Sequence, residues 1–100
     1  MMTEIKDTIT EKKLDKYEDV TKRALEKAKI IIPKNTHLHK IAEDYYDMAE
    51  RYYKDALFFR ENKDFINAFA ALNYAHGWLD AGARLGLFEV DHDNVLFTVD

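Results

Sequence analysis

Apolar side chains recur at intervals of three and four residues along most of this chain, and two features interrupt that pattern. One is Pro33, the single proline, and the other is the polar run ENKD at residues 61–64. Proline lacks an amide proton and disfavours helix at the preceding residue, so a first helix must end near Ile31 or Ile32. The spacing therefore predicts amphipathic helices over residues 9–32, 36–61 and 65–85, and a tail over residues 87–100.

Residues that commonly cap helices stand at the ends of these segments. Side-chain oxygens of Ser, Thr, Asp and Asn accept hydrogen bonds from the first free amides of a helix, and glycine readily takes the left-handed conformation after its last turn. The predicted N-caps are Thr8, in a capping box with Glu11, then Asn35 or Thr36, and Asp64, while Gly86 is the predicted C-cap.

Short connections require successive helices to run antiparallel. We therefore expect an all-α fold, an up-down-up three-helix bundle with an extended C-terminal tail packed on it. The tail ends in the β-prone run VLFTV at residues 95–99, which one chain alone is not expected to turn into a sheet. One hundred residues with 47% hydrophobic content fit a single helical-bundle domain over residues 1–100.

Each predicted helix has one apolar face that should point inward. The first carries Leu14, Tyr17, Thr21, Ala24, Leu25, Ala28 and Ile32; the second carries Leu38, Ile41, Ala42, Tyr45, Met48, Ala49, Tyr52, Ala56 and Phe59, widened by Tyr46, Tyr53 and Leu57; the third carries Ala68, Ala71, Leu72, Ala75, Leu79, Gly82 and Leu85.

Two glycines fall inside the third helix, where each costs about 1 kcal/mol relative to alanine. Gly82 lies on the inward face, so we expect an aromatic ring from another helix, such as a tyrosine of residues 36–61, to fill the space beside it. Gly77 lies in an outward stripe with Asn73, Asp80 and Arg84. A solvated face does not need a glycine, so we expect the tail, a second copy of the chain or another partner to lie against it.

The chain has more aromatic residues than a core of this size is expected to bury. Phe58 projects among charged residues on the outer side of the second helix, which makes it a candidate contact residue. Tyrosine doublets at 45–46 and 52–53 are spaced by seven residues and suit a core, a ligand slot or an oligomer seam. The candidate contact residues are Phe58, Asn73, Tyr74, Gly77, Trp78, Asp80 and Arg84.

Composition restricts the location and the partners. The chain has no cysteine, no apolar run long enough to cross a membrane and no apolar block of a signal peptide, so we expect a cytoplasmic protein without a membrane partner. Residues 64–100 carry six acidic residues and one basic residue, Arg84, which weighs against nucleic acid as a partner.

The residues favour no catalytic centre, no metal site and no cofactor. His37 and His39 point to different faces, and His76 suits a boundary position of the third helix. The runs EVDH (89–92) and DHDN (91–94) resemble fragments of metal motifs but lack the further ligands that such sites require. An enzyme is left open, and a protein without catalytic activity is favoured.

The run YYKDALFFRENKDFINAFAALNYAHGWLDAGARLGLF (residues 52–88) is similar to a family of short archaeal proteins, the domain-of-unknown-function family 357. The resemblance spans roughly residues 10–99 and is most specific around Asn73, Gly77 and Trp78. It implies a compact helical domain of cytoplasmic archaeal origin, and no activity. A looser likeness to the RNA-cleaving helical domains of prokaryotic defence systems lacks their Arg and His pair, because His76 has no arginine in the preceding turns.

These observations favour a non-enzymatic module that works by protein–protein contact or self-association. The alternative is a protein that binds a small molecule or a nucleotide in a pocket near Tyr74, Asp80 and Arg84, roofed by the tail. An RNA-binding or RNA-cleaving domain ranks third.

Overall fold

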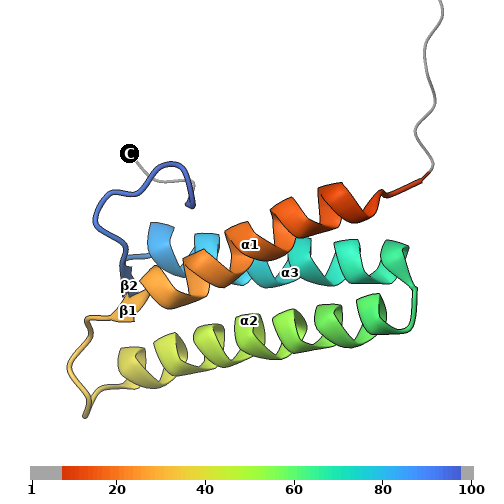
Figure 1. Ribbon diagram of the computed structural model, residues 1–100. Coiled ribbons are helices and arrows are strands. Elements are labelled where there is room, and N and C mark those ends of the chain that lie inside the picture. Colours follow the sequence, from red (N-terminus) through yellow and green to blue (C-terminus); the bar gives the residue numbers. More distant parts are fainter. Residues whose placement is uncertain (1–7, 98–100) are drawn as a thin grey trace, which may run out of the picture.

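A computed structural model describes residues 8–97 of the chain. Its three helices are α1 (Glu11–Lys27), α2 (His37–Glu61) and α3 (Phe65–Arg84), and its two short strands are β1 (Lys29–Ile30) and β2 (Phe88–Glu89). Successive helices run antiparallel, with α1 lying across the α2–α3 hairpin (Figure 1). The all-α three-helix bundle predicted from the sequence is confirmed.

The helix starts follow from local hydrogen bonds. Thr36 accepts from the amide of His39 at 3.2 Å and Asp64 accepts from the amide of Asn67 at 3.2 Å. The first N-cap is Thr10, whose hydroxyl accepts from the amide of Lys13 at 3.1 Å, and not Thr8 as predicted. A threonine two residues later offers the same side-chain oxygen, so composition alone could not distinguish the two positions.

The first helix is shorter than predicted. It ends at Lys27, because Ala28 adopts extended backbone and residues 29–30 leave the helix to form β1. β1 pairs antiparallel with β2, with Lys29 opposite Glu89 and Ile30 opposite Phe88. The pairing joins residues nearly sixty positions apart, which helical periodicity near Pro33 cannot reveal.

The end of α3 is fixed by two crossed hydrogen bonds. The Leu87 amide donates to the Gly82 carbonyl at 2.9 Å and the Gly86 amide donates to the Ala83 carbonyl at 3.1 Å. Gly86 has φ +78°, the left-handed conformation that this terminal motif requires and that glycine adopts without strain. The turn sends the chain back toward the bundle and delivers Phe88 to the core.

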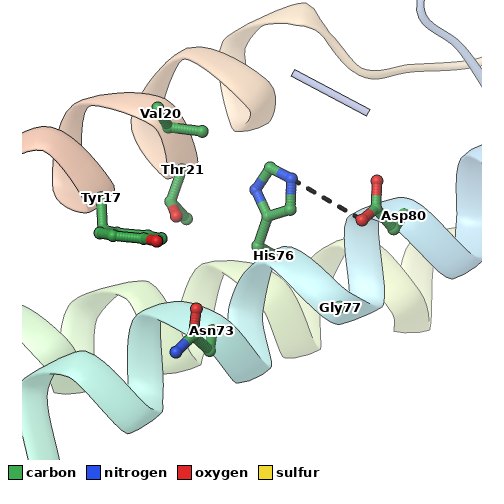
Figure 2. Close-up of a pocket in the computed structure, with 7 residues that line it drawn as sticks. All are labelled: Tyr17, Val20, Thr21, Asn73, His76, Gly77 and Asp80. Carbon is green, nitrogen blue, oxygen red and sulfur yellow. Dashed lines mark ion pairs between the residues drawn. The ribbon is translucent and has the colours of Figure 1, made fainter. Parts of the chain in front are cut away.

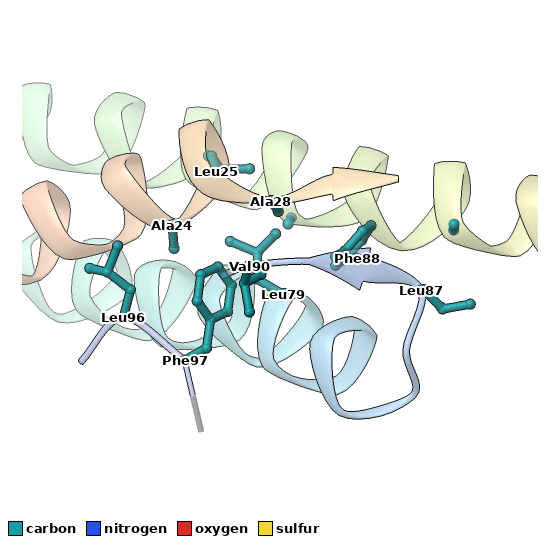
Figure 3. Packing of buried hydrophobic residues seen from close by; sticks show 11 residues of the cluster. Ala24, Leu25, Ala28, Leu79, Leu87, Phe88, Val90, Leu96 and Phe97 are labelled. Atoms are coloured by element: carbon teal, nitrogen blue, oxygen red, sulfur yellow. The ribbon is translucent and has the colours of Figure 1, made fainter. Parts of the chain in front are cut away.

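The tail packs on the bundle of its own chain. It is extended at Phe88–Glu89 and then turns at Asp91 and His92, which both have positive φ. The turn returns Leu96 and Phe97 to the same apolar cluster as Ala24, Leu25, Ala28 and Leu79 (Figure 3). Tail residues that are at most 5% exposed are Leu87, Phe88, Val90, Leu96 and Phe97.

Asp93 stabilises this turn. Its carboxylate accepts hydrogen bonds from the amides of Leu96 and Val95, each at 3.0 Å. The bond from Leu96, together with that from Val95 and the nearby Lys27, lowers the pKa of Asp93. Within the predicted β-prone run, residues 95–97 form part of this turn, and residues 98 and 99 lie outside the described residues.

The predicted inward positions are buried or half-buried, except for three leucines that are exposed. Leu38, Leu57 and Leu85 are 53%, 38% and 64% exposed. Leu38 lies in the first turn of α2 and Leu85 is the C-cap of α3, where few neighbours remain to cover a side chain. Helical spacing predicts the direction in which a side chain points. It does not predict whether a neighbouring helix extends far enough to cover that side chain.

A ring does fill the space beside Gly82, but it comes from the tail and not from a tyrosine of α2. A Cβ added at Gly82 would lie 2.2 Å from Cε2 of Phe88, well inside van der Waals contact. Phe88 is 3% exposed, so surrounding atoms hold its ring in place. Close approach of the tail to α3 therefore requires glycine at this position.

Gly82→Ala should destabilise the protein by about 1–3 kcal/mol, the usual cost of forcing an extra methyl into a packed core. Chemical denaturation followed by circular dichroism measures this loss. Phe88→Leu provides the control: in that background the Gly82→Ala penalty should shrink, because the ring that the methyl meets is gone. Equal penalties in both backgrounds would contradict the contact.

Candidate functional site

Six of the seven candidate contact residues predicted from the sequence separate into three surfaces, and the seventh, Arg84, lies in the last turn of α3. Asn73, Gly77 and Asp80 line a hollow between α1 and α3. Tyr74 and Trp78 lie on another side of α3, among aromatic rings of α2. Phe58 stands apart on α2. Their role as contact residues stays a prediction, but the structure shows which of them can act together.

The hollow between α1 and α3 has a volume of about 290 Å³. Its α1 wall is formed by Tyr17, Val20 and Thr21, and Figure 2 shows Tyr17 and Thr21 projecting toward α3. Its α3 wall is lined by Asn73, His76, Gly77 and Asp80. Three of these residues belong to the predicted stripe, which also included Arg84, and His76 was not part of it. We call this site the α1–α3 hollow.

Gly77 forms an open part of this wall. Outside its own helix backbone, no described atom lies within 4 Å of the position that a Cβ would occupy. The expectation that the tail lies against Gly77 is therefore wrong for the described residues. The other two expected occupants, a second copy and a different partner, stay predictions.

His76 is the functional candidate that sequence reasoning underrated. Its Nε2 lies 3.8 Å from Oδ2 of Asp80, one turn further along α3, and its ring stacks on Phe97 with centroids 6.2 Å apart. Its Nδ1 is buried without a hydrogen-bond partner among the described residues. The i, i+4 spacing of His76 and Asp80 was the available signal. The stacking on Phe97 could not be foreseen, since it depends on the path of the tail.

The second surface is a row of four aromatic rings across α2 and α3. Tyr52 meets Tyr74 with centroids 4.5 Å apart, Tyr45 meets Trp78 at 4.9 Å, and Tyr74 meets Trp78 at 6.1 Å, all edge to face. We call these residues, Tyr45, Tyr52, Tyr74 and Trp78, the aromatic row. Tyr74 is 51% exposed, so the row reaches solvent.

The aromatic row faces away from α1. Tyr74 is two residues from His76, which turns it about 200° around the axis of α3, and His76 points to α1 across the hollow. On α2, Tyr46 points the other way, and its hydroxyl donates to the Leu25 carbonyl of α1 at 2.8 Å. Burial, with the charges of Glu50 and Glu26, raises the pKa of Tyr46. One side of the hairpin is thus covered by α1 and the other is open.

The pocket predicted near Tyr74, Asp80 and Arg84 stays a prediction, and the α1–α3 hollow shares only Asp80 with it. Asp80 lines the α1–α3 hollow, whereas neither Tyr74 nor Arg84 is among its lining residues. Six residues separate Tyr74 from Asp80, which places the two side chains about 120° apart around α3. The tail residue Phe97 stacks on His76 but is not among the residues that line the hollow, so the expected roof stays a prediction.

Phe58 is 62% exposed and touches the edge of Phe59, with ring centroids 6.1 Å apart. The charged residues near it on α2 form their own ion pairs, Asp47 with Arg51 at 2.8 Å and Glu50 with Lys54 at 3.9 Å. Its exposure agrees with the sequence-based expectation, and its use as a contact stays a prediction.

The family of the chain follows from a comparison with family models. The model described as "Protein of unknown function (DUF357)" matches residues 16–88. The chain belongs to this family. The match covers most of α1, all of α2 and α3, and the strand residue Phe88. It therefore includes the residues of the α1–α3 hollow and of the aromatic row in this DUF357 protein. No curated protein and no solved structure matches the chain.

Membership of DUF357 brings no activity or ligand with it. Among residues 8–97, no three His, Asp or Glu side chains are grouped so that they could hold a metal ion, and no helix is long and apolar enough to span a bilayer. His39 instead pairs its Nδ1 with the Ile32 carbonyl at 2.8 Å. Archaeal origin and a cytoplasmic location stay predictions.

Gly77→Ala should stabilise the protein by about 0.5–1 kcal/mol, because alanine is the better helix former and nothing within the chain meets its methyl group. Urea denaturation of the two proteins measures the difference. A loss of stability would show that some contact within the chain does require glycine at position 77.

Proposed function

We propose that this DUF357 protein is a non-enzymatic module that works by protein–protein contact, and that its open α2–α3 side is the contact surface. The observation that carries the proposal is the aromatic row. Four rings lie in edge contact with one another, and Tyr74 among them is half exposed. Tyrosine and tryptophan supply large contact areas with little loss of conformational entropy, and they dominate the energetics of many interfaces.

The surface around the row also has the composition of an interface centre. Between Asp64 and Asp80, α3 contains no acidic residue, no lysine and no arginine. Its exposed positions in this span are Ile66, Asn67, Ala70, Asn73, Tyr74 and Gly77, of which Asn73 and Gly77 line the α1–α3 hollow. Charged residues are depleted at the centres of protein interfaces, because burying them requires an exact partner. An ordinary solvated helix face would carry several charges.

The partner that fits this surface is a second copy of the chain. Charges of opposite sign flank the uncharged span of α3, with Asp64 at its N-terminal end and Arg84 at its C-terminal end. Two α3 helices packed antiparallel around a twofold axis at Tyr74 would bury the uncharged span of each copy against that of the other. Twofold symmetry of this kind is the commonest arrangement of soluble homo-oligomers.

Two exposed leucines extend the same surface. Leu38 and Leu85 lie seven residues beyond Tyr45 and Trp78 on their respective helices, about two turns along, and are 53% and 64% exposed. Burying such side chains contributes roughly 25 cal/mol for each Å² of apolar area removed from water. Self-association would therefore explain the two leucines that the fold leaves uncovered at this end of the hairpin.

Light scattering over a wide concentration range should give the mass of a dimer for the wild-type protein. Tyr74→Lys should give a monomer, because the twofold axis would bring two ammonium groups together at the centre of the interface. Circular dichroism of each variant checks that the helices remain.

Phe58→Ser supplies the matched control, since it removes an exposed ring from α2 outside the aromatic row. The proposal expects this variant to remain a dimer. A wild-type monomer at all concentrations would contradict self-association. Dissociation by Phe58→Ser, without an effect of Tyr74→Lys, would place the contact on the outer face of α2 instead.

A further inference from the structure

Positive charge is concentrated at one end of the bundle, where β1, β2, the start of α2 and the end of α3 lie (Figure 1). Residues 27–42 contain four lysines, two histidines and no acidic residue, although the net charge of the chain is −4. Lys27 forms ion pairs with the tail. The other three, Lys29, Lys34 and Lys40, are exposed, and no ion pair among the described residues includes them.

The position of Lys40 does not favour the helix that carries it. α2 begins at His37, and its first turn contains no acidic residue. The N-terminal end of a helix has a partial positive charge, so acidic side chains stabilise it and a lysine there is unfavourable. The stability of α2 therefore does not explain the positive charge at this end of the bundle.

An exposed isoleucine lies in the same segment. Ile30 and Ile32 pack against the core cluster, while Ile31 between them is 55% exposed. The Ile31 amide donates to the Leu87 carbonyl at 3.5 Å, so the backbone at this position is tied to the end of α3. We call the following residues the basic patch: Lys29, Ile31, Lys34 and Lys40.

Acidic side chains limit the extent of the basic patch. Glu43 and Asp44 are exposed on α2, about one turn after Lys40. Glu89 is also exposed and lies opposite Lys29 in the strand pair. A bilayer or a nucleic-acid duplex would extend past the patch and bring its own negative charges against these carboxylates. The patch therefore fits a short negatively charged segment better than an extended polyanion.

We propose that the basic patch docks a short acidic segment of another protein, with an apolar side chain of that segment on Ile31. The carboxylates of the segment lie beside the lysine ammonium groups, which only donate hydrogen bonds. Single-stranded nucleic acid fits less well, because it is held by aromatic rings on which bases stack, and the patch contains none. The patch shares no residue with the aromatic row, so this docking goes beyond self-association and does not depend on it.

Two capped hexapeptides test the chemistry. One has the sequence Glu-Asp-Glu-Leu-Asp-Glu, and the other has lysine in place of every acidic residue. Titrated into the ¹⁵N-labelled full-length protein, the acidic peptide should give saturable shifts of the amide signals of Ile31, Lys34 and Lys40. The basic peptide should leave these signals in place. Raising the salt concentration from about 0.1 M to about 1 M should weaken the binding, because the Debye length falls from about 10 Å to about 3 Å.

Variants locate the site. Lys34→Glu should weaken the acidic peptide about three- to tenfold, as expected for the reversal of one exposed charge. Lys63→Glu is the matched control, since it changes the net charge equally at the turn between α2 and α3, the opposite end of the bundle, and should have no effect. Ile31→Ser should weaken this peptide but not its variant with alanine in place of leucine. Tyr74→Lys, which tests self-association, should leave the peptide shifts intact.

Each contrary result overturns the proposal. The absence of saturable shifts with the acidic peptide, or equal losses in Lys34→Glu and Lys63→Glu, would show that the patch is not such a site. Binding to vesicles of phosphatidylserine and phosphatidylcholine, or to single-stranded RNA, without binding of the peptide would assign the patch to a polyanion of another class. Shifts of the same signals in the free protein as its concentration rises would assign the patch to a second copy of the chain.

Discussion

The contact between Phe88 and Gly82 determines how the rest of this protein is arranged. The crossed hydrogen bonds at the end of α3 and the left-handed Gly86 turn the chain back, and the missing side chain of Gly82 admits the Phe88 ring. Once this ring is in place, residues 88–89 lie beside β1 and the tail enters the core. The tail thus becomes part of the hydrophobic core. Its contribution is important in a chain of one hundred residues, because small domains bury a smaller fraction of their surface than large ones.

The path of the tail also decides which surfaces remain open. α1 and the tail cover the same side of the α2–α3 hairpin, where Tyr46 and Leu79 are packed. The other side keeps the aromatic row, and the α1–α3 hollow stays open at Gly77 beyond the point where Phe97 meets His76. Two surfaces of different character result, a row of aromatic rings across α2 and α3 and a small hollow between α1 and α3.

The sequence predicted the features that depend on local chemistry. Thr36 and Asp64 act as N-caps and Gly86 as the C-terminal turn, because their roles depend on neighbours within a few residues. The early end of α1 was missed since it depends on pairing with a distant strand. The exposure of Leu85 was missed as well, because periodicity gives a direction and does not show whether a neighbouring helix extends that far.

The candidate site was predicted only in part for the same reason. Asn73, Gly77 and Asp80 share a stripe of one helix, and the structure brings them together at one hollow. The opposite wall, including Tyr17, comes from α1, and spacing within α3 contains no information about it. Tyr74 and Arg84 were assigned to one pocket with Asp80, and neither of them lines this hollow.

Amide hydrogen exchange, followed by NMR under native conditions, tests most directly whether the tail is part of the core. The account predicts that the amides of Leu87 and Phe97, which donate to Gly82 and Asp93, exchange with protection comparable to the buried amides of α3 around Leu79. Their protection should fall sharply in Gly82→Ala, which displaces the Phe88 ring. Exchange of the Leu87 and Phe97 amides at the rate of an unstructured chain, while α3 stays protected, would contradict it.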